Sequence, residues 1–325
     1  MSTTLRWSYA LNQWNNPPTA FVRHEHQERV LRSCSVLGFD AVELQGGSGR
    51  WNNMGRREHI ELGHGSIGGF REFLARSGIT QVSSMTWDPT APAEEEGGAR
   101  RSTSSATDRA TILDSATRFL DLLADLEART FVVRAAESAW LLADGPDLGA
   151  IGDLHNAIGA ESSARGIRLA LDVDCLSALR PHLPGLLAAT DPALVGINVD
   201  TAELTIAGHD PLAVIRENPT RIAHVQLKDA RVVDSGDAYR QPFAETALLQ
   251  GGAEPHVERW FYELGTAGGL VDVAGVVDAL AEIDYTGWVV VESDQSPAPT
   301  ESAMLNAWYL RTIPRAGFPG SRSNR

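Results

Sequence analysis

Hydrophobic residues along this chain follow two periods in turn. Short apolar runs rich in β-branched residues, which are typical of buried strands, alternate with longer segments that carry apolar residues every three or four positions. The strand-like runs cover residues 5–11, 41–45, 80–85, 130–135, 167–173, 195–199, 222–227 and 288–292. The helical patterns cover residues 24–37, 70–76, 110–126, 148–165, 176–189, 211–217, 273–283 and 300–312. This order predicts repeated strand–helix units from one end of the chain to the other.

The alternation favours a parallel sheet, because a helix between two strands carries the chain back so that both strands run in the same direction. A closed (β/α)8 TIM barrel is the natural arrangement for such units in 325 residues. Gly38, Gly78 and Gly166 stand between a helical pattern and the next strand, where glycine commonly ends a helix. A doubly wound open sheet is the alternative, and the lack of a G-x-G-x-x-G motif after the first strand disfavours it.

We expect one barrel domain over residues 1–314, with loop insertions on its C-terminal face. Residues 89–108 are polar and rich in Pro, Gly and Ser, and residues 231–258 form a long insertion after the seventh strand. Loops that leave the carboxyl ends of barrel strands commonly cover the active site, so each insertion is either a lid or a simple decoration. Residues 315–325 are expected to form a flexible tail.

Composition narrows the set of partners. Hydrophobic residues make up 43% of the chain, as in ordinary globular proteins, and the formal net charge is −14. Surplus negative charge repels phosphate backbones and anionic lipids, which disfavours nucleic acid and membranes as partners. The two cysteines, Cys34 and Cys175, fit free thiols in a reducing compartment. Neither a signal peptide nor an apolar stretch of about 20 residues is visible, so we expect a cytoplasmic protein.

Acidic and amide side chains end four successive predicted strands: Asp172, Asp200, Gln226 and Glu292. In a barrel these strand ends converge on one mouth. Several carboxylates in one cleft are unfavourable unless a cation or protons neutralise them, and an oxygen-rich set suits Mn²⁺ or Mg²⁺. The alternative is that each carboxylate caps the helix that follows it.

Four segments resemble motifs of a known superfamily. HVQLKD (224–229) is similar to the seventh-strand H-x-H-x-K-D motif of the xylose-isomerase-like sugar isomerases, epimerases and dehydratases. GLVDVAGVVDAL (269–280) with YTGWVVVESDQ (285–295) resembles the last strand–helix unit of the inosose dehydratase-like branch. NVDTAELTIAGHDP (198–211) and GFDAVEL (38–44) resemble its sixth and second strands. The resemblance implies a (β/α)8 barrel that acts on carbohydrates.

The resemblance also implies one divalent metal, held by carboxylates of strands five, six and eight and by a histidine of strand seven. By motif these positions are Asp172, Asp200 and Glu292, with Gln226 where the family carries histidine. Mn²⁺ is the expected ion, and Mg²⁺, Co²⁺ and Zn²⁺ are alternatives. A glutamine carbonyl binds hard cations but is weaker than imidazole for Zn²⁺ or Co²⁺. We expect His224 to be a packed or hydrogen-bonded strand residue on the face opposite Gln226.

Five further residues are expected to contact the substrate. Trp14 and Trp87 follow the first and third strands, where aromatic rings suit the C–H faces of a sugar, although ordinary rim packing explains them equally well. Glu43 ends the second strand, and Glu203 stands where many relatives have a substrate-binding histidine. Lys228 belongs to the K-D pair that faces the substrate in the family, and its ammonium would stabilise a developing enolate oxygen.

Three carboxylates are candidates for the catalytic base. Glu292 and Asp200 are predicted metal ligands that would also accept a proton. Glu263 is a third candidate, because ELGTAGGLVD (263–272) returns the chain from the long insertion and its glycines let the backbone pass close to a ligand. The alternative for Glu263 is a surface ion pair.

The chemistry that the resemblance implies is removal of a proton from the carbon next to a carbonyl. Elimination from a keto-sugar or keto-polyol, as in an inosose dehydratase or a 3-keto-glycoside-cleaving enzyme, is favoured over isomerisation or epimerisation of a ketose. A non-catalytic sugar-binding subunit is the rival from another class, suggested by Gln226 and Glu203. Abasic-site endonucleases share the barrel, but the charge of −14 argues against them. We expect a small-molecule sugar as partner and a homo-oligomer, with a second small subunit as an open alternative.

Overall fold

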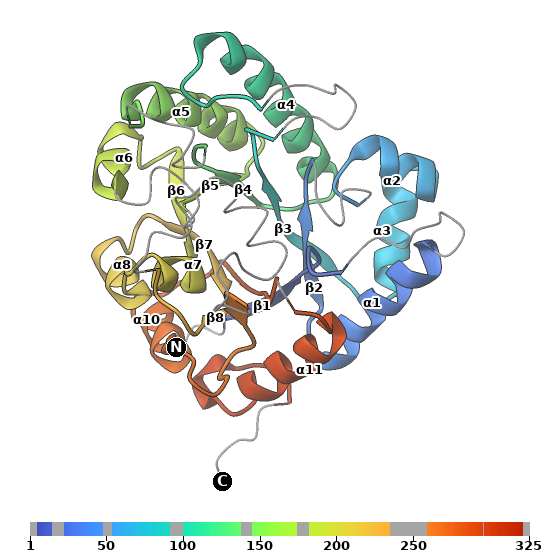
Figure 1. Cartoon of the computed structure of the whole chain (residues 1–325). Coiled ribbons are helices and arrows are strands. Elements are labelled where there is room, and N and C mark those ends of the chain that lie inside the picture. Colours follow the sequence, from blue (N-terminus) through green and yellow to red (C-terminus); the bar gives the residue numbers. More distant parts are fainter. Residues whose placement is uncertain are drawn as a thin grey trace.

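The predicted (β/α)8 barrel is confirmed. The computed structural model describes residues 5–14, 23–47, 54–91, 100–137, 145–173, 182–234, 259–294 and 296–320. Parallel strands close into a barrel in the order β1-β10-β7-β6-β5-β4-β3-β2, and the helices form a ring around it (Figure 1). The barrel strands are β1 (Arg6–Ala10), β2 (Ala41–Gln45), β3 (Gln81–Trp87), β4 (Thr130–Arg134), β5 (Arg168–Asp172), β6 (Val195–Asp200), β7 (Ile222–Leu227) and β10 (Trp288–Val291).

Each predicted helix corresponds to an observed one, although residues 176–181 of the helix predicted over 176–189 lie outside the described residues. They are α1 (Arg23–Leu37), α2 (Arg57–His64), α3 (Ile67–Arg76), α4 (Ala106–Asp125), α5 (Leu148–Ala164), α6 (Leu183–Ala189), α7 (Thr201–Ile206), α8 (Pro211–Glu217), α10 (Val273–Glu282) and α11 (Pro299–Leu310). The three glycines that were predicted to end helices do so. Gly38, Gly78 and Gly166 have φ of +105°, +86° and +66°, and each follows the end of a helix. Only glycine adopts this left-handed conformation without strain.

Alternation along the strands separates an aliphatic core from a polar interior. On β7, Val225 and Leu227 join the main hydrophobic core, whereas His224 and Gln226 form hydrogen bonds with Glu43 of β2. Residues two apart on a strand share a face, so His224, Gln226 and the following Lys228 belong to the same side of the barrel wall. Because of this alternation, polar side chains of β7 point into the barrel interior and toward its carboxyl end.

Helices α2 and α7 and strands β8 and β9 were not predicted. Helix α2 has eight residues and precedes α3. Helix α7 follows β6 directly, and β8 (Asp229–Ala230) pairs antiparallel with β9 (Phe261–Tyr262). These elements contain too few residues for a hydrophobic period to be visible in the sequence. Residues 92–99 of the first insertion and 235–258 of the second lie outside the described residues, as does Cys175. Cys34 is a buried free thiol, as expected.

The expected flexible tail is wrong for residues 315–320, which pack against the barrel. The indole Nε1 of Trp7 donates a 2.8 Å hydrogen bond to the carbonyl of Ala316, and the ring of Phe318 lies 4.9 Å from that of Phe39. Burial of this aromatic ring holds the segment in place. Residues 321–325 lie outside the described part of the chain. No helix that the structure describes has both the length and the apolar character needed to cross a bilayer.

Candidate active site at the barrel mouth

A buried lysine lies at the carboxyl end of β7. Lys228 is 3% exposed. Its ammonium nitrogen Nζ lies 2.8 Å from Oδ2 of Asp200, 3.1 Å from Oδ2 of Asp294 and 3.3 Å from Oε2 of Glu292. The three acids come from the ends of β6 and β10, the strands that flank β7 in the barrel. These four side chains form one group at the mouth, which we call the Lys228 cluster.

Charges in the Lys228 cluster do not balance, because one ammonium faces three carboxyl groups. Burial alone would lower the pKa of Lys228, but Asp200, Asp294 and Glu292 raise it well above its usual range, so the lysine keeps its charge. Burial, together with the nearby Asp294, raises the pKa of Glu292 well above its usual range. Burial also raises the pKa of Asp200, although Lys228 opposes the change. The cluster therefore combines a fixed positive charge with carboxyl groups that hold a proton more readily than exposed ones.

Neighbouring elements hold the Lys228 cluster in place. Asn12, which follows β1, donates from Nδ2 to Oε1 of Glu292 and, at 3.1 Å, to Oδ1 of Asp294. Phe261 on β9 places its ring centre 4.3 Å from the lysine Nζ, a cation–π contact. The side chain of Asp294 is 24% exposed, so the cluster reaches solvent on that side.

A second polar group fills the barrel interior. The carboxylate of Glu43 accepts hydrogen bonds from Oγ of Ser84 at 2.7 Å and from Nε2 of Gln226 at 2.8 Å, and it lies 2.8 Å from Nε2 of His224. Both oxygens of Glu43 are thus engaged, and the side chain is buried. These bonds place Glu43 among the polar side chains of the barrel interior, and its contact with a substrate stays a prediction.

The expected orientation of His224 is wrong in one respect. His224 is buried and hydrogen-bonded, as predicted, but it shares a face with Gln226, since both side chains bond to Glu43. The physical reason is that side chains two positions apart on a strand point to the same side.

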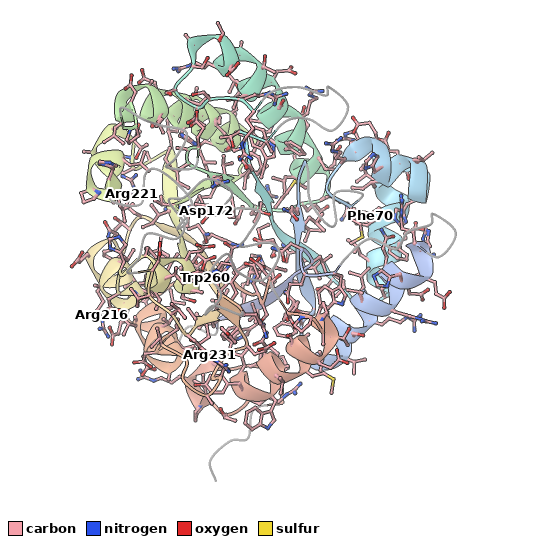
Figure 2. All side chains as sticks on the ribbon, in the orientation of Figure 1. Phe70, Asp172, Arg216, Arg221, Arg231 and Trp260 are labelled. Carbon is pink, nitrogen blue, oxygen red and sulfur yellow. The ribbon has the colours of Figure 1, made fainter. Side chains whose placement is uncertain are left out.

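Asn198 joins the two remaining residues of the predicted metal site. Its Nδ2 donates to Oδ1 of Asp172 at 2.9 Å and to Oε1 of Gln226 at 2.7 Å. Figure 2 shows Asp172 on the inner side of the helix ring, whereas Arg216 lies at its outer edge. The side-chain carbonyl of Gln226, the atom that would bind a metal, therefore already accepts a hydrogen bond from the protein.

The four predicted metal ligands are divided into two pairs, and each pair is bridged by a donor of the chain itself. Lys228 bridges Asp200 and Glu292, and Asn198 bridges Asp172 and Gln226. Within the described ranges, no three His, Cys, Asp or Glu side chains are grouped in a way that could hold a metal ion. A divalent cation beside the ammonium of Lys228 would meet like charge in a buried site. The arrangement does not fit the predicted Mn²⁺ site.

The two predicted aromatic contacts are packed into the core. Trp14 lies 5.7 Å from the ring of Tyr9 and donates from Nε1 to Oγ1 of Thr300. Trp87 stacks on Phe131 with 5.8 Å between ring centres. Both tryptophans are buried members of the main hydrophobic core. Packing, the alternative in the sequence analysis, accounts for both side chains.

The two other predicted glutamates have different surroundings. Glu203 is buried on α7, and its charge contributes to the raised pKa of Lys228, so it belongs to the electrostatic surroundings of the cluster. Glu263 instead pairs with Arg259, whose two terminal nitrogens lie 3.2 Å from its oxygens, and accepts a hydrogen bond from Ser302. The ion pair weighed for Glu263 is therefore present, half-buried rather than on the surface.

Sequence reasoning missed Asn12, Asn198 and Phe261. The signal for Asn198 was available, because it precedes Asp200 by two positions on β6 and must share its face. Asn12 lies just past β1, in the same strand-end position as the acids that were found. No sequence signal places Phe261, because its position depends on how the chain returns after residues 235–258.

A closed (β/α)8 barrel with polar side chains gathered at the carboxyl ends of its strands defines the class of protein. The chain belongs to the xylose isomerase-like TIM barrel family, whose model matches residues 31–311. This confirms the family to which the sequence motifs pointed.

Curated relatives agree with this family, and a solved structure shares the fold. The chain is 34% identical over 131 residues to an inosose dehydratase of Clostridium tetani, covering 39% of this chain and 40% of that protein. It is 30% identical over 184 residues to an inosose dehydratase of Geobacillus thermodenitrificans, covering 54% and 55%. These matches span about half the relatives' length or less. A D-allulose 3-epimerase from Methylomonas sp. shares the fold, with a TM-score of 0.64 at 14% identity over 97% of this chain and 100% of that one.

Proposed function

We propose that the protein removes a proton from the carbon next to the carbonyl of a keto-sugar or keto-polyol and then eliminates a β-substituent. The observation that carries this proposal is the Lys228 cluster, a buried ammonium ringed by carboxyl groups at the barrel mouth. The similarity to proteins named inosose dehydratases supports elimination as the reaction type.

The cluster has the groups that such an elimination needs. The ammonium of Lys228 donates to the carbonyl oxygen and stabilises the negative charge that develops there as the C–H bond breaks. One carboxylate of the Asp200 and Glu292 pair accepts the proton. The other, as a carboxylic acid, protonates the leaving β-hydroxyl, so that water departs as the carbon–carbon double bond forms. Asn12 orients Glu292 for this transfer.

Two alternatives give different products from the same start. Reprotonation of the enediolate at the neighbouring carbon or on the opposite face would give isomerisation or epimerisation, with no change of mass. A sugar-binding subunit without catalysis, suggested by Gln226 and Glu203, would bind the sugar and return it unchanged. Product analysis therefore separates the three functions.

The test is to incubate the protein with keto-inositols, ketohexoses and 3-keto-glycosides and to follow the products by mass spectrometry. We expect loss of water or of the glycosidic substituent from at least one of these classes. Asp200→Asn, which is nearly isosteric, should lower the rate by roughly 10²–10⁴-fold, the usual effect of removing a general acid or base. Binding of the sugars without any change in them would contradict the proposal.

A further inference from the structure

We infer that Lys228 and Asn198 take the place of a divalent metal, so that the site binds and acts on its oxygen-rich substrate without one. The inference rests on the proposed function for its catalytic meaning, but its physical content concerns cation binding alone. It follows from which oxygens accept the N–H groups of Lys228 and Asn198.

The first observation is the position of the ammonium. Nζ of Lys228 lies within 3.3 Å of carboxylate oxygens from Asp200, Asp294 and Glu292, which is where a cation shared by these acids would lie. The backbone of Lys228 is held in place, because Oγ1 of Thr201 donates a 2.6 Å hydrogen bond to its main-chain carbonyl oxygen. The ring of Phe261 covers the ammonium.

The second observation is the orientation of the two amides. A carboxylate can only accept hydrogen bonds, so Nε2 of Gln226 must face Glu43 and Nδ2 of Asn198 must face Asp172. Oε1 of Gln226 is then left to accept the second N–H of Asn198. The side-chain amides of Asn198 and Gln226 thus link Asp172 on β5 to Glu43 on β2 through hydrogen bonds. A metal bound to Asp172 or Gln226 would have to break these hydrogen bonds.

The chemical consequence is a single positive charge in place of two. An ammonium stabilises an enolate oxygen by hydrogen bonding and charge, as a metal does, but it cannot chelate two substrate oxygens at fixed angles. The site therefore suits a substrate whose carbonyl is activated at one oxygen.

Metal binding can be measured without any substrate. The wild-type protein would be treated with a chelator, dialysed and analysed for metal content, and then titrated with Mn²⁺ by calorimetry and by thermal unfolding. We expect no stoichiometric metal and no rise in Tm. Lys228→Met removes the charge at similar volume, so the three acids no longer surround an ammonium and can rearrange around Mn²⁺, and Tm should rise with its concentration. Lys228→Arg keeps the charge and should behave as the wild type.

One equivalent of Mn²⁺ bound to the wild-type protein, with a raised Tm, would overturn the inference. Failure of Lys228→Met to gain any response to Mn²⁺ while folded would also overturn it, and if that variant does not fold, the wild-type titration decides. If the proposed function is wrong, the product analysis shows unchanged sugars, whereas the Mn²⁺ titration still shows no bound metal. The two failures are therefore distinguishable.

Discussion

At the scale of single residues, Glu263 is a candidate base whose carboxylate is already paired with Arg259 and Ser302. Burial raises its pKa, but hydrogen bonds from Ser302 and Arg259 lower it below the usual value overall, which is unfavourable for a base at neutral pH. We predict that Glu263→Gln leaves turnover close to that of the wild type and lowers the free energy of unfolding by about 1–3 kcal/mol, because Arg259 loses its charged partner. Turnover and urea unfolding check this. A loss of turnover of roughly 10²-fold with unchanged stability would restore Glu263 as the base.

The same scale shows what the sequence could and could not predict about the site. Asp200, Glu292 and Lys228 were found because strand ends converge in a barrel whatever the details of packing. Their partners were not found, because hydrogen bonds such as that between Asn198 and Gln226 depend on distances across the barrel. The misfit between the predicted Mn²⁺ ligands and their surroundings has the same origin: residue types at strand ends do not show which donor each oxygen already has.

At the scale of elements, helix α5 contains a titratable group that makes stability depend on pH. Burial lowers the pKa of His155 to about 4, although a hydrogen bond with the carbonyl of Ile151 opposes this. The unfolded value is about 6.5, so the folded protein binds fewer protons between these values. The stabilising contribution is complete above pH 6.5 and is lost as the pH falls to about 4, at most about 3 kcal/mol.

We therefore predict that wild-type stability falls more steeply than that of His155→Leu between pH 6.5 and pH 4. Chemical unfolding at several pH values measures the difference, and other titrating groups cancel in the comparison. Equal slopes for the two proteins would mean that His155 titrates normally in the folded state.

The loop between β9 and α10 offers a matched pair of glycines. Gly265 and Gly268 have φ of +68° and +77°, so alanine at either position costs roughly 1–2 kcal/mol of backbone strain. A Cβ at Gly265 would also lie 2.0 Å from the ring of Tyr309, whereas a Cβ at Gly268 would meet nothing within 4 Å. Gly265→Ala should therefore lower Tm more than Gly268→Ala. Equal losses would show that Tyr309 moves aside without cost.

Elements were predictable where their period was long enough to read. Each barrel strand was located within two residues at either end, because its apolar alternation is bounded by glycine or polar residues. The β8–β9 pair was not, although it places Phe261 over Lys228, because two-residue strands have no period. The packed segment around Phe318 was missed because its aromatic contacts are made with residues near the other end of the chain.

At the scale of the whole molecule, barrel closure is what makes the site. Acids from β6 and β10 meet a lysine from β7 only because these strands are neighbours in the closed order. The chain carries a net charge of −14, yet one of its cations is buried among acids at the mouth, where water screens its charge less than at the surface. We propose that this ammonium activates a carbonyl for removal of the adjacent proton.

The most direct measurement is deuterium incorporation at the carbon next to the carbonyl of a keto-sugar or keto-polyol. Chelator-treated wild-type protein and Lys228→Met would be incubated with each compound in deuterated buffer without added metal, and exchange would be followed by NMR. We expect exchange well above the buffer rate in the wild type and a loss of roughly 10²–10³-fold in the variant, the usual effect of removing one oxyanion donor. Exchange that appears only when Mn²⁺ is added, or that survives unchanged in Lys228→Met, would contradict this proposal.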